Sequence, residues 1–132
     1  MKKNCIILIA GLLLSACATS YNPTYHYNEI LVVNNSKQLI QDVTISASET
    51  GRQFSCGNIA PRGICSDKFP SRRYEQSPIQ ISWVFGGSTG QTGEFVLEVP
   101  ETMSIEVPLR GVLAISPNGK ISAYFEQEPP VN

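Results

Sequence analysis

The chain has 132 residues, a length typical of one domain with a single core. Its 10 basic residues are nearly balanced by 11 acidic ones, which gives a formal net charge of −1. A nucleic-acid-binding domain concentrates positive charge, so this balance excludes nucleic acid from the expected partners.

The first 16 residues have the organisation of a secretory signal. Two lysines follow the initiator methionine, residues 5–14 are uncharged and mostly apolar, and the small residues Ser15 and Ala16 come next. A membrane-spanning helix needs ~20 apolar residues, so this run is too short to remain as a transmembrane anchor. We expect residues 1–16 to be removed on export.

The end of this segment, Leu14-Ser15-Ala16-Cys17, resembles the lipobox of bacterial lipoproteins. The resemblance implies that Cys17 becomes the N-terminus, with a diacylglyceryl thioether on its sulfur and an acyl chain on its amine. Several acyl chains together anchor a protein stably in lipid. Ala18, rather than aspartate, follows the cysteine, which in enteric-type lipoproteins implies the outer membrane. We therefore expect a lipid-anchored outer-membrane protein that faces the periplasm.

Two alternatives to lipidation are open. Residues 16–18 also fit the A-x-A pattern of an ordinary signal cleavage site, which would release a soluble periplasmic protein after Ala18. An uncleaved N-terminal anchor is the other. The lipidated form is favoured because the complete lipobox stands at the end of the apolar run.

Removal of the signal leaves 132 − 16 = 116 residues, with 8 basic and 11 acidic residues and a net charge of −3. Residues 17–28 are expected to form the lipidated N-terminus and a tether that reaches roughly 18 Å. Tyr21, Tyr25 and Tyr27 would then lie at the headgroup level. Alternatively, and preferably, the last two begin the first strand. His26 is expected to be a solvated side chain rather than a ligand.

Residues 29–126 alternate between apolar and polar side chains with the period of half-buried strands. The clearest segments are 42–47, 79–85, 95–99, 103–107 and two around a turn within 112–125, while residues 29–35 are a short, continuous apolar run. In that turn, Asn118-Gly119 is expected to supply the positive φ angles of a tight hairpin. No window of 11 residues shows a helical stripe.

This pattern predicts an all-β fold, an antiparallel immunoglobulin-like β-sandwich of seven to nine short strands, with a small closed β-barrel as the alternative. Immunoglobulin domains have a tryptophan between two distant cysteines. Here Trp83 follows both nearby cysteines, so only the architecture is carried over. Residues 127–132 are expected to form a polar, proline-rich tail.

Two of the four cysteines remain for the folded domain, because Cys5 leaves with the signal and Cys17 is assigned to lipid. In an oxidising compartment, Cys56 and Cys65 are expected to form a disulfide. A zinc site would need more cysteine or histidine ligands, and the lone His26 lies far upstream. A redox dithiol would favour C-x-x-C spacing.

Catalytic motifs are weak in this chain. The segment GGSTG, Gly86 to Gly90, matches G-x-S-x-G, but a nucleophile elbow needs a following helix and a later histidine. We interpret it as a hairpin loop. The glycosylation pattern at Asn34 is interpreted as a turn. We expect no enzyme activity, no metal and no cofactor.

Charge is uneven along the sequence. Residues 52–73 contain one acidic residue, Asp67, and five basic residues: Arg52, Arg62, Lys68, Arg72 and Arg73. Residues 94–128 instead carry six acids against two basic residues. We expect a disulfide-closed loop that presents Arg62, and a second connection after Pro70 that presents the last two arginines. If both lie at one end of the domain, they form a cationic surface for phosphate or carboxylate groups.

Three functions agree with these observations. The favoured one is a non-enzymatic binding or structural accessory module of the cell envelope, whose partner is an envelope protein or an anionic envelope component. A flat charged face would favour it. The second is an inhibitor or immunity-type lipoprotein, favoured by a projecting rigid loop. The third, a hydrolase, would need a deep polar cleft with two close carboxylates.

Overall fold

The computed structural model describes residues 23–128, and all of the regular secondary structure in that range is β-strand. The expected lipobox, Cys17, Tyr21 and the last four residues of the tail lie outside this range. The strands are β1 (His26–Asn34), β2 (Ile40–Ala47), β3 (Arg52–Ile59), β4 (Ile64–Arg73), β5 (Ile79–Phe85), β6 (Ser88–Gln91), β7 (Leu109–Ile115) and β8 (Ile121–Glu126). No helix in the described range has the length and apolar character needed to cross a membrane.

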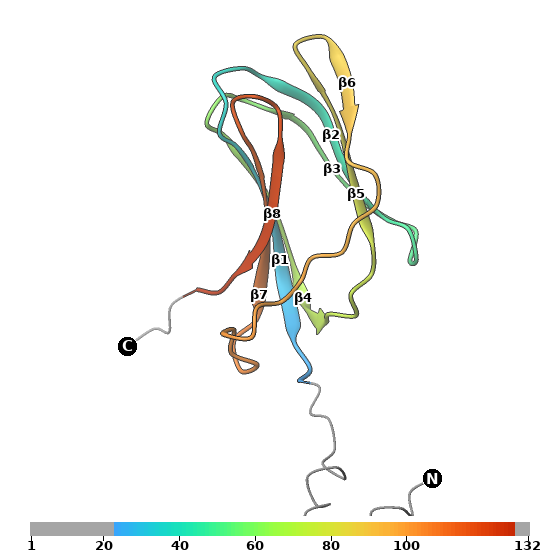
Figure 1. Ribbon diagram of the computed structural model, residues 1–132, viewed down its shortest axis with the longest axis vertical. Coiled ribbons are helices and arrows are strands. Elements are labelled where there is room, and N and C mark those ends of the chain that lie inside the picture. Colours follow the sequence, from blue (N-terminus) through green and yellow to red (C-terminus); the bar gives the residue numbers. More distant parts are fainter. Residues whose placement is uncertain (1–22, 129–132) are drawn as a thin grey trace, which may run out of the picture.

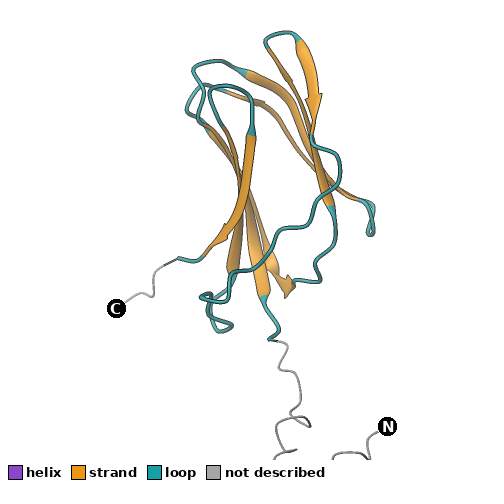
Figure 2. Ribbon diagram, in the orientation of Figure 1, coloured by secondary structure: helices purple, strands orange, loops and turns teal. Residues whose placement is uncertain are grey.

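The strands form two four-stranded sheets, in the orders β4-β1-β7-β8 and β3-β2-β5-β6, which face each other as two layers (Figures 1 and 2). All neighbours are antiparallel except β1 and β7, which run parallel. The prediction of a β-sandwich is confirmed. The closed-barrel alternative is wrong, because each sheet of the described chain ends in two edge strands.

The core lies between the two sheets and is built by the alternation seen in the sequence. The main cluster of buried side chains consists of Val32, Ile40, Val43, Ile45, Ile59, Ile81, Leu113 and Ile115. A second cluster centres on Leu97, Leu109 and Phe125, next to the start of β7 and the end of β8, which lie at the lower end of the sandwich in Figure 1. Burial of side chains of this size contributes roughly 1.5–3 kcal/mol each, so these residues specify how the layers pack.

The turns at the upper end are tied together by the buried side chain of Asn34, which has 0% exposure. Its Nδ2 lies 2.8–3.1 Å from the carbonyl oxygens of Gln38, Ile59 and Ala60, and its Oδ1 accepts from the Ser36 amide. These bonds join the β1–β2 turn to the β3–β4 turn, and both of these turns connect one sheet to the other. The interpretation of this segment as a turn is confirmed.

Two expected strands are absent from the described chain. Residues 95–99 and 103–107 belong to a long connection between β6 and β7, with a single bridge between Ile79 and Phe95. Phe95, Leu97, Val99 and Met103 nevertheless pack on the second core cluster. In residues 95–99 the alternation therefore reflects burial of one side of the segment rather than pairing within a sheet, whereas in residues 103–107 it is not matched by burial, because Ile105 is 46% exposed.

Two strands, Arg52–Ile59 and Ile64–Arg73, take up most of the expected disulfide-closed loop 56–65 and the expected connection after Pro70. Both are edge strands, which commonly carry charged residues and proline because one side of their backbone has no neighbouring strand. Pro70 of β4 fits this position. The expected disulfide-closed loop is thus mostly strand, with a short turn between β3 and β4.

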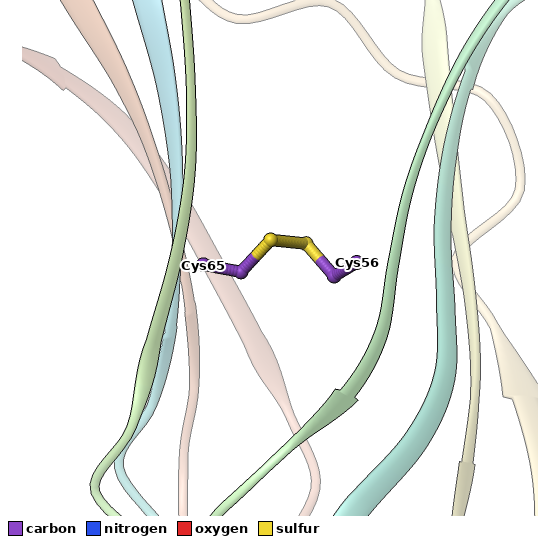
Figure 3. The surroundings of a disulfide bond; sticks show 2 residues. All are labelled: Cys56 and Cys65. Carbon is purple, nitrogen blue, oxygen red and sulfur yellow. A yellow bond between two sulfur atoms is a disulfide. The ribbon is translucent and has the colours of Figure 1, made fainter.

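The disulfide between Cys56 and Cys65 is confirmed, with a Cα–Cα distance of 6.0 Å. Figure 3 shows it running from β3 to β4, across the gap between the two layers. It therefore joins one edge strand of each sheet.

Both hairpins expected from the sequence are present, β5–β6 and β7–β8, but the loop of the second is wider than expected. The β5–β6 turn is Gly86-Gly87, with φ angles of 59° and 82°, so the G-x-S-x-G segment is a hairpin as expected. The β7–β8 hairpin is also present, but its loop spans five residues, 116–120, and only Gly119 has a positive φ. Asn118 instead accepts a hydrogen bond from the Lys120 amide, which stabilises this wider turn.

The first strand begins earlier than residue 29. Tyr25 accepts a hydrogen bond from the Tyr74 amide, and Tyr27 packs in the second core cluster. These two tyrosines therefore lie at the start of the sandwich, which was the preferred interpretation. His26 is exposed on β1, as expected.

Candidate ligand-binding cleft

A cleft of about 650 Å³ lies between the edge strands β3 and β4, below the disulfide. Its floor is made of apolar side chains from the inner strands, the edge strand β8 and the long β6–β7 connection: Ile30, Ile45, Ile79, Leu97, Leu113 and Phe125. The volume is in the range of small-molecule sites, which are commonly apolar with a few polar groups that fix orientation.

The β3 wall of the cleft is formed by the first residues of the strand. The consecutive residues Arg52, Gln53 and Phe54 all line the cleft. The Arg52 backbone pairs with Ala47 of β2, which also lines the cleft. Arg52 therefore lies beside the entrance at the β2–β3 turn.

The β4 wall contains a bulge that changes which residues face inward. Between the pairs Tyr27–Arg72 and Glu29–Lys68, β1 contributes only Asn28, whereas β4 contributes the three residues 69–71. Such an insertion re-aims the side chains that follow it. Arg72 consequently lines the cleft together with Phe69, and its guanidinium carbon lies 4.4 Å from the centre of the Phe69 ring.

A row of edge-to-face aromatic contacts supports the lower part of this wall. Tyr27 contacts Phe69 at 5.2 Å and Tyr74 at 5.7 Å between ring centres, and Tyr74 contacts Phe125 at 4.9 Å. The Tyr74 hydroxyl donates a 2.6 Å hydrogen bond to the Leu97 carbonyl. Burial raises the pKa of Tyr74 to about 12, with a smaller contribution from the nearby Glu98 carboxylate. The ring row is thus anchored to the β6–β7 connection.

The structure separates the five basic residues singled out in the sequence. Arg52, Arg72 and Arg73 line the cleft. Lys68 points away from it on the outer face of β4, and Arg62 lies in the β3–β4 turn at the opposite end of that strand. Since a strand rises about 3.3 Å per residue, Arg62 is about 30 Å from the last two arginines. The expected joint surface of Arg62, Arg72 and Arg73 is therefore wrong.

Two acidic residues, Asp67 and Glu75, also line the cleft. Six of the residues between them belong to β4, which places their carboxylates on the order of 20 Å apart. Paired catalytic carboxylates in glycosidases lie about 5–9.5 Å apart. The cleft therefore lacks the close carboxylate pair on which a hydrolase was expected to depend.

Arg110 of β7 forms a separate cluster of ion pairs with three glutamates. Arg110 stands between Glu29 and Glu126 on adjacent strands and also reaches Glu128, with N–O distances of 3.5, 3.3 and 3.2 Å. Such cross-strand pairs stabilise a particular register. The side chain of Glu29 is nearly buried, so the cluster holds β1, β7 and β8 in place. Nothing in the sequence spacing signalled it.

No group of three or more histidine, cysteine, aspartate or glutamate side chains among residues 23–128 is placed to hold a metal ion. Ser88 of the G-x-S-x-G segment lies in β6, on the far edge of its sheet from the cleft. Among residues 23–128, the cleft between β3 and β4 is therefore the candidate binding site.

Known proteins offer a distant structural likeness. No protein-family model matches the chain, and no curated protein matches it. Among solved structures, the chain is similar to one described as the NMR structure of a protein from Eubacterium rectale. The two share 10% sequence identity over 84% of this chain and 96% of that chain, with a TM-score of 0.43. A likeness at this level carries no argument about function.

Proposed function

We propose that the protein is a non-enzymatic binding module of the bacterial cell envelope, lipid-anchored through Cys17, that takes an anionic ligand in the cleft between β3 and β4. The observation that carries the proposal is the set of three arginines, Arg52, Arg72 and Arg73, around a cleft with an apolar floor. Arginine recognises carboxylate and phosphate groups through two parallel N–H donors.

These arginines are available for a ligand. Every ion pair within 4.0 Å among the described residues involves Arg110, so the cleft arginines have no carboxylate partner there. Arg72 stacks on Phe69, and this leaves the edge of its guanidinium free to donate hydrogen bonds. A binding module was expected to have a flat charged face, but these arginines line a concave cleft instead.

The lipid anchor is tested by the Cys17→Ala variant. Wild-type protein should partition into detergent and carry acyl chains by mass spectrometry, and the variant should carry none. Wild-type protein that begins at Thr19 without lipid would contradict the anchor and support the ordinary signal-cleavage alternative.

The binding function is tested with a secreted form that begins at Ala18, which keeps every described residue of the core and cleft. Sedimentation with outer-membrane fractions should be reduced by the triple change of Arg52, Arg72 and Arg73 to serine. Arg62→Ser is the matched control, because this arginine is exposed at the other end of β4. Binding should also weaken at high salt, since exposed charges are screened over ~8 Å at physiological ionic strength. Equal sedimentation of all three proteins would contradict the proposal.

A further inference from the structure

We infer that the ligand of this cleft is a single-chain amphiphile with one negative charge, a fatty-acid carboxylate. The inference rests on the proposed function and names the class of ligand. Four features of the cleft support it: its floor, its net charge, the character of its two walls and its position relative to the start of the chain.

The floor of the cleft requires an apolar ligand group. It is formed by aliphatic and aromatic side chains from both sheets, with Ile45 and Ile79 on one side and Ile30 and Leu113 on the other. A small inorganic anion held at the arginines would leave this surface in contact with water. An alkyl chain would cover it, and each buried methylene should increase the affinity about fourfold.

The charge of the cleft matches a single negative headgroup. Three arginines and two acids line it, so its formal charge is 3 − 2 = +1. Asp67 and Glu75 would repel a headgroup with two or more negative charges. A carboxylate satisfies the two-donor geometry of arginine and neutralises the cleft.

The two walls disfavour an extended peptide that would add a strand. Pro70 has no N–H to donate from the edge of β4, and the β4 bulge distorts the same stretch. On the β3 edge, Gly57 has a φ of 65° and stands at a register shift. Strand addition needs a regular row of donors and acceptors, so a ligand held by side chains fits these walls better.

The cleft is placed where such a ligand would be encountered. The described chain begins at Pro23, next to the start of β1, and β4 ends at Arg73, which pairs with His26. Figure 1 shows the start of β1 and the end of β4 together at the lower end of the sandwich. Only five residues, 18–22, separate Pro23 from Cys17. A chain acylated at Cys17 would therefore hold this end of the sandwich close to the bilayer.

The test uses the secreted form from Ala18 and isothermal titration with hexanoate, octanoate and decanoate below their micelle concentrations. Affinity should rise about tenfold or more for each pair of methylenes. Decanol, which lacks the charge, should bind at least tenfold more weakly than decanoate, and so should decyl phosphate as a dianion. Equal affinities along the carboxylate series would overturn the inference.

Variants locate the site. Arg72→Ser should weaken decanoate binding about tenfold, and Arg62→Ser should leave it unchanged. Ala47→Trp should fill the entrance and reduce binding of decanoate more than that of hexanoate. If Ala47→Trp does not fold, as judged by its melting transition, the chain-length series on wild type still decides the matter.

The two proposals fail in different ways. Sedimentation with membranes that depends on the cleft arginines, together with no chain-length effect, would keep the proposed function and overturn the fatty-acid ligand. Loss of both effects would overturn both. Chain-length dependence that is unaffected by Arg72→Ser and by Ala47→Trp would place amphiphile binding elsewhere and overturn this inference alone.

Discussion

The upper and lower ends of the sandwich are built differently. At the upper end, Asn34 ties two turns together, and the disulfide joins the two edge strands just below them. At the lower end, the same edge strands separate around the cleft, and their arginines lack carboxylate partners among residues 23–128. The upper end is thus fastened by features that serve stability alone, whereas the lower end combines a second core cluster with the proposed binding cleft. We therefore expect changes at the upper end to affect stability and not binding, and changes to the cleft arginines to affect binding more than stability.

The largest expected effect is that of Asn34→Ala. The change removes the donor to the carbonyls of Ile59 and Ala60 and leaves buried polar groups unpaired, at about 1–3 kcal/mol for each. We expect the free energy of unfolding to fall by about 4 kcal/mol, measured by urea denaturation. Asn35→Ala, at the exposed neighbouring position, is the control and should change it by less than about 0.5 kcal/mol. Similar values for the two variants would show that the upper end does not depend on this side chain.

The disulfide should come next. Replacing Cys56 and Cys65 together by alanine removes the constraint on a short loop and should lower stability by ~2.7 kcal/mol on the chain-entropy estimate. Ligand binding should persist at temperatures where the variant is folded, because neither cysteine lines the cleft. Intact mass after alkylation without reductant should show no label on the wild-type pair. Labelling of both cysteines would disprove the disulfide in the exported protein.

Tyr74→Phe should have a smaller and pH-dependent effect. Loss of the hydroxyl leaves the Leu97 carbonyl without this donor and should cost about 1 kcal/mol at neutral pH. The folded pKa of about 12 is above the unfolded value of 10.0, since burial favours the neutral phenol. The stabilisation is therefore complete below pH 10 and is lost as the pH rises towards 12. Melting curves between pH 8 and 12 should converge for the two proteins, and a constant difference across that range would contradict this account.

The smallest effect on stability should come from Arg72→Ser. Its stacking on Phe69 is half-exposed, and such contacts contribute about 0.5–1 kcal/mol. Lys68→Ser, on the outer face of the same strand, is the matched control for stability and should also leave ligand binding unchanged. A loss of several kcal/mol in the arginine variant would mean that the lower end, too, is built mainly for stability.

Sequence reasoning succeeded where a signal is local. Alternation of apolar residues predicted the β-sandwich, the nearby cysteines predicted the disulfide, and paired glycines predicted the β5–β6 hairpin.

The packing of Trp83 is a detail that only the structure explains. A Cβ atom at Gly90 would stand 2.8 Å from its ring, so the indole lies across the space of the absent side chain.

The cleft was not predictable in the same way. Its β4 wall depends on the bulge at residues 69–71, because without that insertion Arg72 would share the outer face with Lys68. The exposure of β4 alternates, but its inward positions include Cys65 and Asp67 beside Phe69, so the sequence shows no apolar stripe there and predicts only a loop over 56–65 and a connection after Pro70. The Arg110 cluster joins residues from three strands, and their proximity follows only from the register.

The position of β1 has a mechanical consequence. β1 is the first strand after the N-terminus and lies between β4 and β7, hydrogen-bonded along both of its edges. A pull on the chain at Pro23 is transmitted first to β1, which can leave its sheet only when its bonds to both β4 and β7 are broken. Forced unfolding is governed by the rate of crossing the unfolding barrier. If the chain is tethered at Cys17, the membrane therefore pulls on the strand that is best held within its sheet.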